Sequence, residues 1–270
     1  MSIKTLPVLP GDGIGPEVID AALDWLAGQG FNVPVLKLPF GYGCWKETGT
    51  ALPEETVRAI REHGVALLGA ATTPEKGCAS PILELRRTLD LEFQIRPMPG
   101  GGPTLLIHNF SGLYAEPEDP GPPAVTKWIL HPHQADSMAR HAFELAKKRV
   151  TFVDKPTVRR AAASMLRAAA ERHATVDWEL INADAFVASL VKDPAVFDVV
   201  VATSFVGDVI SDLMAALGTG LPTAASISVG KNVRVFEPVH GTAVHRVGNA
   251  DPTGAIEAAK LLRDHLAGKG

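Results

Sequence analysis

The chain has 270 residues, of which 46% are hydrophobic and 21% charged, and its formal net charge at pH 7 is −4. That length can bury a sizeable core, in one large domain or two medium ones, and the mildly acidic balance argues against broad nucleic-acid or anionic-membrane binding. The N-terminus lacks the apolar core of a signal peptide and no run of about 18 apolar residues occurs, so we expect a cytoplasmic protein without a membrane partner.

Buried strands and amphipathic helices alternate along the chain. In order, we expect a strand at 3–9, a helix from 16, a helix at 54–63, strands at 65–68 and 150–153, a helix at 157–173, strands at 176–181 and 197–202, a helix at 206–217, and a final helix at 252–265. This alternation predicts an α/β fold with a largely parallel central sheet. Gly and Pro between 97 and 132 predict a loop-rich excursion there.

The chain contains two cysteines, Cys44 and Cys78. Neither has a second Cys or a His at zinc-ligand spacing, and two cysteines cannot build a disulfide framework. We therefore expect two reduced thiols.

Asp208 and Asp212 lie four residues apart in the segment GDVISD. On a helix this spacing places both carboxylates on one face, about 5–6 Å apart at Cβ. Two like charges so close are mildly unfavourable unless a cation joins them, and oxygen-only ligands favour Mg²⁺ or Mn²⁺ over zinc. A solvated helix face, or a pair favoured by the helix dipole, is the alternative.

Three cationic side chains are candidates for binding an anion or moving a proton. Arg86 and Arg96 belong to LELRRTLDLEFQIRP, where two guanidinium forks could clamp a dicarboxylate, although each could also be a surface arginine. Lys155 follows a predicted strand, at the end where α/β proteins place active-site groups. The alternative interpretation is an exposed loop lysine without a role in the chemistry.

Two glycine-containing turns complete the set of candidate segments. GDGIGP is not the GxGxxG fingerprint, and tight turning of the backbone explains it without a ligand. In EPVHGTA, His240 could contact a ligand or cap the turn.

Seven motifs then occur in the order seen in isocitrate and 3-isopropylmalate dehydrogenases. They are LPGDGIGPEV, LELRRTLDLEFQIRP, SGLY, VDKPTV, NADAFV, GDVISDL and EPVHGTA…DPTGA. The chain resembles this family of metal-dependent β-decarboxylating dehydrogenases from Leu6 to Leu266, as a shortened member.

The resemblance implies a two-domain isopropylmalate-dehydrogenase-like α/β fold, distinct from the Rossmann fold. A large domain on the cofactor side would comprise 1–91 and 219–270. A small central domain, 92–218, would carry the dimer interface and the metal and catalytic residues. It also implies a small anionic substrate and a homodimer with shared active sites.

Residue roles follow from the motifs. The resemblance implies catalytic roles for Lys155 and Tyr114, and metal ligation by Asp184, Asp208 and Asp212, with Lys155 and Asp184 lent across the interface. Substrate contacts are expected from Arg86, Arg96, Ser80, Ile82, Leu83 and Asn109. Cofactor contacts are expected from His240, Gly241, Thr242, Ala243, His245, Arg246 and Asp251.

The expected reaction is oxidation of a 2-hydroxy di- or tri-carboxylate with NAD(P), followed by β-decarboxylation to a 2-keto acid. A divalent cation would acidify the hydroxyl, Lys155 would help take its proton, and Tyr114 would protonate the enol carbon.

Two departures from the family pattern bear on the substrate. Ile107 stands where the family has an arginine, with His108 next; losing one charge-assisted contact weakens carboxylate binding by about 1.5–3 kcal/mol. Either His108 compensates, the substrate differs, activity is impaired, or the alignment slips. Ser80 resembles the serine that isocitrate enzymes have at this position. Ile82 and Leu83 instead resemble the apolar pocket of isopropylmalate enzymes and cannot hydrogen-bond a third carboxylate. This favours an isopropylmalate-, malate- or tartrate-like acid over isocitrate.

The cofactor is interpreted from EPVHGTAVHRVGNADP. His245 and Arg246 occupy the stretch where NAD-using relatives carry an acidic residue, and a basic pair suits the extra phosphate of NADP. Asp251 stands where the family commonly has asparagine, and an exposed loop remains the alternative for the basic pair.

Two alternatives remain open. The chain could be a catalytically silent binding or regulatory subunit of the same family, or a dehydrogenase that does not decarboxylate.

Overall fold

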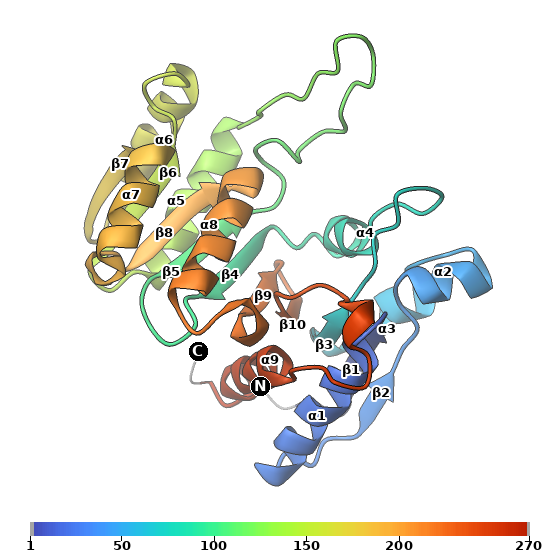
Figure 1. Cartoon of the computed structure of the whole chain (residues 1–270). Coiled ribbons are helices and arrows are strands. Elements are labelled where there is room, and N and C mark those ends of the chain that lie inside the picture. Colours follow the sequence, from blue (N-terminus) through green and yellow to red (C-terminus); the bar gives the residue numbers. More distant parts are fainter. Residues whose placement is uncertain (1–2, 269–270) are drawn as a thin grey trace. The chain divides into compact units, whose positions relative to one another are not determined.

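The computed structural model describes residues 3–268, and the ends of the predicted domain ranges, residues 1–2 and 269–270, lie outside it (Figure 1). The chain forms two compact units. Unit 1 combines the residues up to Glu92 with those from Thr219 on, and unit 2 is Phe93–Gly218.

Unit 1 contains five strands, five α-helices, two short 3-10 turns and connecting loops within its described residues. In chain order these are β1 (Leu6–Gly11), α1 (Gly15–Gly28), β2 (Val35–Lys37), α2 (Tyr42–Thr48), α3 (Glu54–His63), β3 (Val65–Ala70), α4 (Pro81–Thr88), η2 (Leu221–Thr223), β9 (Ala225–Val229), β10 (Arg234–Pro238), η3 (Val244–Arg246) and α9 (Thr253–Leu266).

The strand order in unit 1 is β2-β1-β3-β10-β9, parallel except for the β10–β9 pair. Apart from the exposed edge strand β2, its strands bury side chains on both faces, as expected for a parallel sheet covered by helices on both sides. One core joins α1 and α9 to residues such as Leu67 and Phe236. The other joins α3 and α4 to Leu68 and Val235.

Unit 2 has five strands and four α-helices within its described residues. These are β4 (Phe93–Pro97), β5 (Thr104–His108), α5 (Pro132–Leu145), β6 (Arg149–Asp154), α6 (Arg160–His173), β7 (Asp177–Asn182), α7 (Ala183–Lys192), the 3-10 turn η1 (Pro194–Val196), β8 (Val199–Thr203) and α8 (Ser204–Leu217).

In unit 2 the strand order is β4-β5-β8-β6-β7, and only the β4–β5 pair is antiparallel. Helices α7 and α8 pack on a core that includes Ile107, Val200 and Phe186. The long green segment between β5 and α5 in Figure 1 is the loop-rich excursion. Its two limbs pair at Gly112–Ile129 and again at Asp119–Val125.

The predicted α/β class with a largely parallel sheet is confirmed. The helix at Glu54–His63 has the predicted bounds, whereas the helix expected from residue 157 begins at Arg160. The reason is a turn: the N–H groups of Val158 and Arg159 both donate to the carbonyl of Lys155, at 2.9 and 2.8 Å. The strand expected from residue 3 begins at Leu6, where pairing with β2 starts.

Parallel strands end at the same edge of a sheet, which positions the candidate residues within each unit. In unit 2, β5 leads to Asn109, β6 to Lys155, β7 to Asp184 and β8 to α8 with Asp208. Among the described residues, no helix is long and apolar enough to cross a bilayer.

Asp12, directly after β1, ties together three loops of unit 1. Its carboxylate accepts the backbone N–H groups of Tyr42, Gly43 and Thr72, each at 2.8 Å. Gly11 makes the turn into this position: its φ is +76°, and a Cβ there would lie 1.9 Å from the carbonyl oxygen of Ala70. The GDGIGP segment is therefore explained by close backbone packing.

We predict that Asp12→Ala lowers the free energy of unfolding by about 2–4 kcal/mol, because three backbone N–H groups lose their acceptor. Urea denaturation measures the change. Asp20→Ala is the control: Asp20 pairs with Lys37 at 2.7 Å, but the two side chains are 61% and 54% exposed. That variant should change stability by less than about 0.5 kcal/mol. Equal effects of the two substitutions would refute the structural role of Asp12.

Candidate active site

Helix α8 presents the two aspartates with the spacing predicted for metal ligation. The side chain of Asp208 is 42% exposed, and Asp212, one turn further on, is exposed. Oxygen donors on one open helix face fit the preference of Mg²⁺ or Mn²⁺. Across the described part of the chain, no group of three His, Cys, Asp or Glu side chains lies together as a metal site, so Asp184 does not join this pair within one chain.

Hydrogen bonds link Asn109 to Arg96, and an ion pair continues from Arg96 to Asp208. Gln94 links them: its amide nitrogen donates to Asn109 Oδ1, and its oxygen accepts from Arg96 Nη2, both at 2.5 Å. Arg96 Nη1 donates to Ser211 Oγ at 2.7 Å, and Nη2 lies 3.9 Å from Asp208 Oδ1. The structure therefore brings a predicted substrate arginine beside a predicted metal carboxylate.

Tyr114 lies close to the same carboxylate. Its backbone N–H donates to Ser204 Oγ at 3.2 Å, in the first turn of α8, and its ring contacts Phe205 edge-on at 6.2 Å between centroids. Burial and the negative charge of Asp208 both raise the pKa of Tyr114 above its ordinary value. The phenol is protonated at neutral pH, as a proton donor requires, and the raised pKa extends this state to higher pH.

Lys155 and Asp184 form a second pair in unit 2. Lys155 Nζ lies 2.5 Å from Asp184 Oδ1, and the two side chains are 36% and 71% exposed. The hydrogen bond from Lys155 holds the pKa of Asp184 below its usual range. The two groups predicted to be lent together across a dimer interface thus lie together on the outside of one chain.

The other predicted substrate residues lie in unit 1. Arg86 Nη2 is 3.6 Å from Glu237 Oε1, a buried carboxylate on β10 that also accepts from Ser228 Oγ at 2.8 Å. Ser80 caps α4 by accepting from Leu83 N, and its hydroxyl accepts from Thr73 Oγ1.

Leu83 is exposed on α4, and Ile82 packs partly against the core. Helix α4 thus offers one apolar side chain to solvent and uses the other for packing.

The predicted cofactor segment folds against the GDGIGP turn within unit 1. Ile14 N donates to the carbonyl of Thr242 at 2.9 Å, and Thr72 Oγ1 lies 3.3 Å from Thr242 Oγ1. His240 Nδ1 lies 3.0 Å from the carbonyl of Gly241, while Nε2 is buried and has no hydrogen-bond partner in the described structure. A cofactor could supply the missing partner, so this segment fits a nicotinamide dinucleotide.

The rest of this segment carries the predicted phosphate contacts. Ala243 has φ +36° and begins η3, on which His245 and Arg246 are exposed. Glu17 anchors the loop by accepting from Gly248 N and Ala250 N.

Asp251 has a local structural partner in this loop. Its Oδ1 accepts from both the N–H and the hydroxyl of Thr253 at the start of α9, and these bonds lower the pKa of the Asp251 carboxyl.

Ile107 has no access to a substrate. It is 0% exposed in the core of unit 2, and a Cβ on Gly207 of α8 would come within 2.6 Å of its side chain. His108 is also buried, with its ring packed edge-on against Phe93. The interpretation that His108 takes over an arginine's contact is therefore not supported, because its ring faces the interior.

Sequence reasoning missed the residues that hold the candidate side chains in place. Gln94 accepts from Arg96, and Glu237 pairs with Arg86. Asp12 holds the turn after β1, and Asp154 accepts from the backbone N–H of Lys155. Asp154 had a usable signal, because a carboxylate at the end of a buried strand needs a partner. The others depend on contacts distant in sequence.

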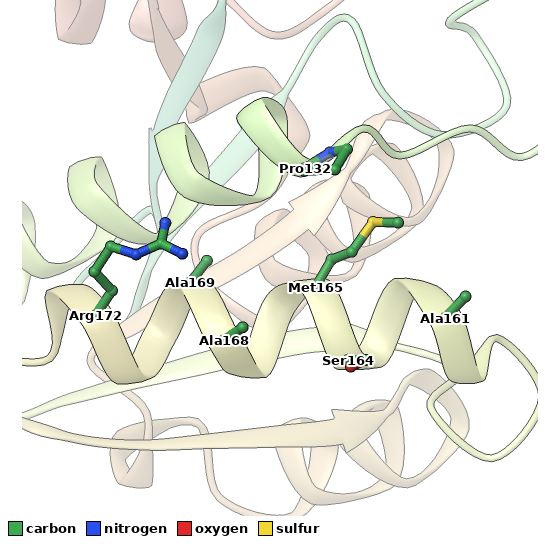
Figure 2. A pocket seen from close by; sticks show the side chains of 7 residues that line it. All are labelled: Pro132, Ala161, Ser164, Met165, Ala168, Ala169 and Arg172. Carbon is green, nitrogen blue, oxygen red and sulfur yellow. The ribbon is translucent and has the colours of Figure 1, made fainter.

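A shallow open hollow of about 440 Å³ lies on α6 beside the start of α5 (Figure 2). Small and apolar side chains line most of it, and Arg172 at one end pairs with Asp136. None of the predicted site residues lines this hollow, so we assign it no part in the chemistry.

Comparisons with known proteins agree with this geometry. The sequence model of the family "Isocitrate/isopropylmalate dehydrogenase" matches residues 5–103 and 107–269. A 3-isopropylmalate dehydrogenase of Methanothermobacter thermautotrophicus is 34% identical over 98% of this chain and 86% of its own length. An isocitrate/homoisocitrate dehydrogenase of Thermus thermophilus is 33% identical over 97% and 85%.

Solved structures show the same fold. The crystal structure of isocitrate dehydrogenase from Methylococcus capsulatus superposes with a TM-score of 0.91 at 28% identity, over 99% of this chain and 87% of that one. A β-decarboxylating dehydrogenase from Thermococcus kodakarensis, in its apo form, gives 0.85 at 30% identity, over 98% and 84%.

The family match and the shared fold define an oxidoreductase of the NAD(P)-dependent, decarboxylating 2-hydroxyacid dehydrogenase class. The chain belongs to the isocitrate/isopropylmalate dehydrogenase family.

We predict that Asp208→Asn lowers the pKa of Tyr114, because it removes a negative charge that opposes ionisation of the phenol. The pKa should stay above the ordinary value, since burial, the larger cause, remains. The sequence has two tyrosines, so a Tyr42→Phe background isolates the tyrosinate absorbance of Tyr114 in a pH titration. Asp212→Asn is the control with a smaller shift; an unchanged midpoint in the Asp208 variant would contradict the proximity.

Proposed function

We propose that the protein oxidises a small 2-hydroxy dicarboxylate with NAD(P) and decarboxylates it at the β position to a 2-keto acid. One arrangement carries the proposal: Arg96 Nη2 lies 3.9 Å from Asp208 Oδ1, and Tyr114 is bonded through its backbone N–H to Ser204, one helical turn before Asp208, which shares an open helix face with Asp212. A proton donor, an anion-binding fork and a pair of oxygen ligands are the parts that this chemistry needs in one place.

The chain's own residues divide the work. Asp208 and Asp212, with Asp184 from a partner, would hold a divalent cation; the cation supplies Lewis acidity, and the nicotinamide accepts the hydride. Arg96 and Arg86 bind substrate carboxylates, with Asn109 fixed beside Arg96. Because Tyr114 stays protonated, it can deliver a proton to the carbon that CO₂ leaves.

The neutral amine form of Lys155 would take the proton of the 2-hydroxyl and become an ammonium. Its Nζ lies beside Asp184, which can stabilise that ammonium, and its backbone is held by the turn after β6. The exposure of this pair supports our proposal that it acts in the site of a second copy of the chain.

The residues that we expect near the substrate favour an isopropylmalate-, malate- or tartrate-like acid over isocitrate. Leu83 is the exposed apolar side chain of α4, and the apolar, buried Ile107 stands where a third arginine would have been expected. The relatives do not separate these acids, since 3-isopropylmalate and isocitrate/homoisocitrate dehydrogenases match at nearly equal identity.

The exposed His245 and Arg246 favour NADP over NAD. The two unpaired cysteines agree with our expectation of a cytoplasmic location.

Absorbance of reduced nicotinamide tests the proposal directly. The panel comprises malate, tartrate, isopropylmalate, isocitrate and homoisocitrate, each with NAD or NADP and Mg²⁺ or Mn²⁺. We expect reduction with one of the first three acids, loss of turnover on chelation by EDTA, release of CO₂, and a preference for NADP that Arg246→Ala removes. Reduction without CO₂ would identify a non-decarboxylating enzyme. Silence of the folded protein across the panel would favour a binding or regulatory subunit.

Complementation tests the shared site. We predict that Lys155→Met and Asp212→Asn are each inactive, because one lacks the base and the other a metal ligand. Mixed after subunit exchange, they should recover about a quarter of wild-type activity: half of the dimers are mixed, and each mixed dimer has one intact site. Mixing Lys155→Met with Asp184→Asn is the control without recovery, since both residues come from the same subunit. No recovery in the first mixture would place Lys155 and Asp212 in one chain's site.

A further inference from the structure

A buried cluster outside the predicted site connects the peptide segments that carry Lys155 and Tyr114. Its centre is Asp154, whose side chain is 1% exposed at the end of β6. Asp154 Oδ1 accepts the backbone N–H of Lys155 at 2.5 Å, and its Oδ2 is paired with the guanidinium of Arg159. A buried carboxylate needs such partners, because an unpaired charge in the interior is strongly unfavourable.

Arg159 closes a ring around the peptide of Lys155. The backbone N–H of Arg159 donates to the carbonyl of Lys155 at 2.8 Å, while its side chain holds the carboxylate that binds the N–H of Lys155. Both polar groups of the Lys155 backbone are therefore fixed through the pair of Asp154 and Arg159. The guanidinium is 14% exposed, so solvent competes little with these bonds.

The same guanidinium reaches the excursion that carries Tyr114. It stacks on the ring of Trp128 at 4.2 Å from the centroid, and its Nη2 donates to the carbonyl of Trp128 at 3.3 Å. Trp128 Nε1 in turn donates to Thr203 Oγ1 at 3.1 Å, at the residue before α8. The stack, the hydrogen bonds and the ion pair fix one geometry of this limb.

From Trp128 the connection continues to Tyr114. Its neighbour Ile129 exchanges both backbone hydrogen bonds with Gly112, at 2.7 and 3.1 Å, two residues before Tyr114. Tyr114 itself is bonded to Ser204, next to Thr203. An unbroken set of contacts thus runs from the turn of Lys155 to Tyr114 and to the start of α8.

We propose that Arg159 is a positioning residue that couples the segment of Lys155 to that of Tyr114 through Asp154 and Trp128. It touches no reacting atom; it fixes where the two proton-transferring residues of the chain are held. This inference rests on the proposed function for its effect on turnover, but the coupling itself is independent of it. Displacing a catalytic group by about 1 Å can lower a rate about 100-fold, so the loss of one such anchor is measurable.

Steady-state kinetics of the full-length protein test the effect, using the acid and nicotinamide that the panel identifies. We expect Arg159→Ala to lower kcat by roughly 10- to 100-fold, with KM for the acid changed less than about threefold. Added ethylguanidinium should restore part of kcat by filling the space over Trp128. Arg160→Ala is the matched control, because its side chain is the next arginine and exposed, and it should match the wild type with or without ethylguanidinium.

Trp128→Phe keeps a ring under the guanidinium but lacks the donor to Thr203, so its kcat should fall less than that of Arg159→Ala. This milder variant covers the case in which Arg159→Ala does not fold. A rise in KM with unchanged kcat, or no rescue by ethylguanidinium, would overturn the positioning role.

Amide hydrogen exchange separates this inference from the proposed function. In Arg159→Ala, exchange should become faster in both 110–116 and 154–159, and stay as in the wild type in α3 of unit 1. Faster exchange in 154–159 alone would overturn the coupling. If the wild-type protein turns over no acid of the panel while both segments respond together, the proposed function fails and the coupling stands.

Discussion

The candidate site depends on four parallel strands, β5, β8, β6 and β7, that end at one edge of unit 2. Because the strands run in the same direction, residues far apart in the sequence leave the sheet side by side. Asn109, the start of α8, Lys155 and Asp184 all follow directly from this arrangement. The same rule places the turn after β1 near the segment after β10 in unit 1, where Ile14 and Thr242 meet.

The ends of the strands bring the candidate side chains to one edge of each sheet, and three acidic residues then fix the positions of the loops and side chains there. Asp12 organises three loops of unit 1, Asp154 fixes the peptide of Lys155, and Glu237 draws Arg86 toward β10. A carboxylate can accept several N–H donors at once and still attract a cation, which suits it to the junction of loops. Loss of any one of these acids leaves donors or a charge without a partner, and the damage spreads to every segment that it joined.

The sequence made the fold class and part of the site predictable. Strand and helix periods are local, so the helix at Glu54–His63 and the helical spacing of Asp208 and Asp212 could be found without tertiary contacts. The link from Asn109 through Gln94 to Arg96 could not, because β4 and β5 must first pair antiparallel. Nor could the stack of Arg159 on Trp128, which joins a helix start to a loop of irregular conformation.

Ile107 shows how core packing excludes a charged side chain from the end of β5. Its side chain fills the space over Gly207, so an arginine there would bury a guanidinium between β5 and α8, where a charge is costly. The absence of an arginine at position 107 is therefore a consequence of core packing. A substitution on the nearby surface would not place a positive charge at this position. Arg96, by contrast, is held by Ser211 and Gln94 and lies 3.9 Å from Asp208, so its guanidinium has a fixed position beside a carboxylate of α8. Packing and hydrogen bonding thus decide together where this part of unit 2 carries positive charge.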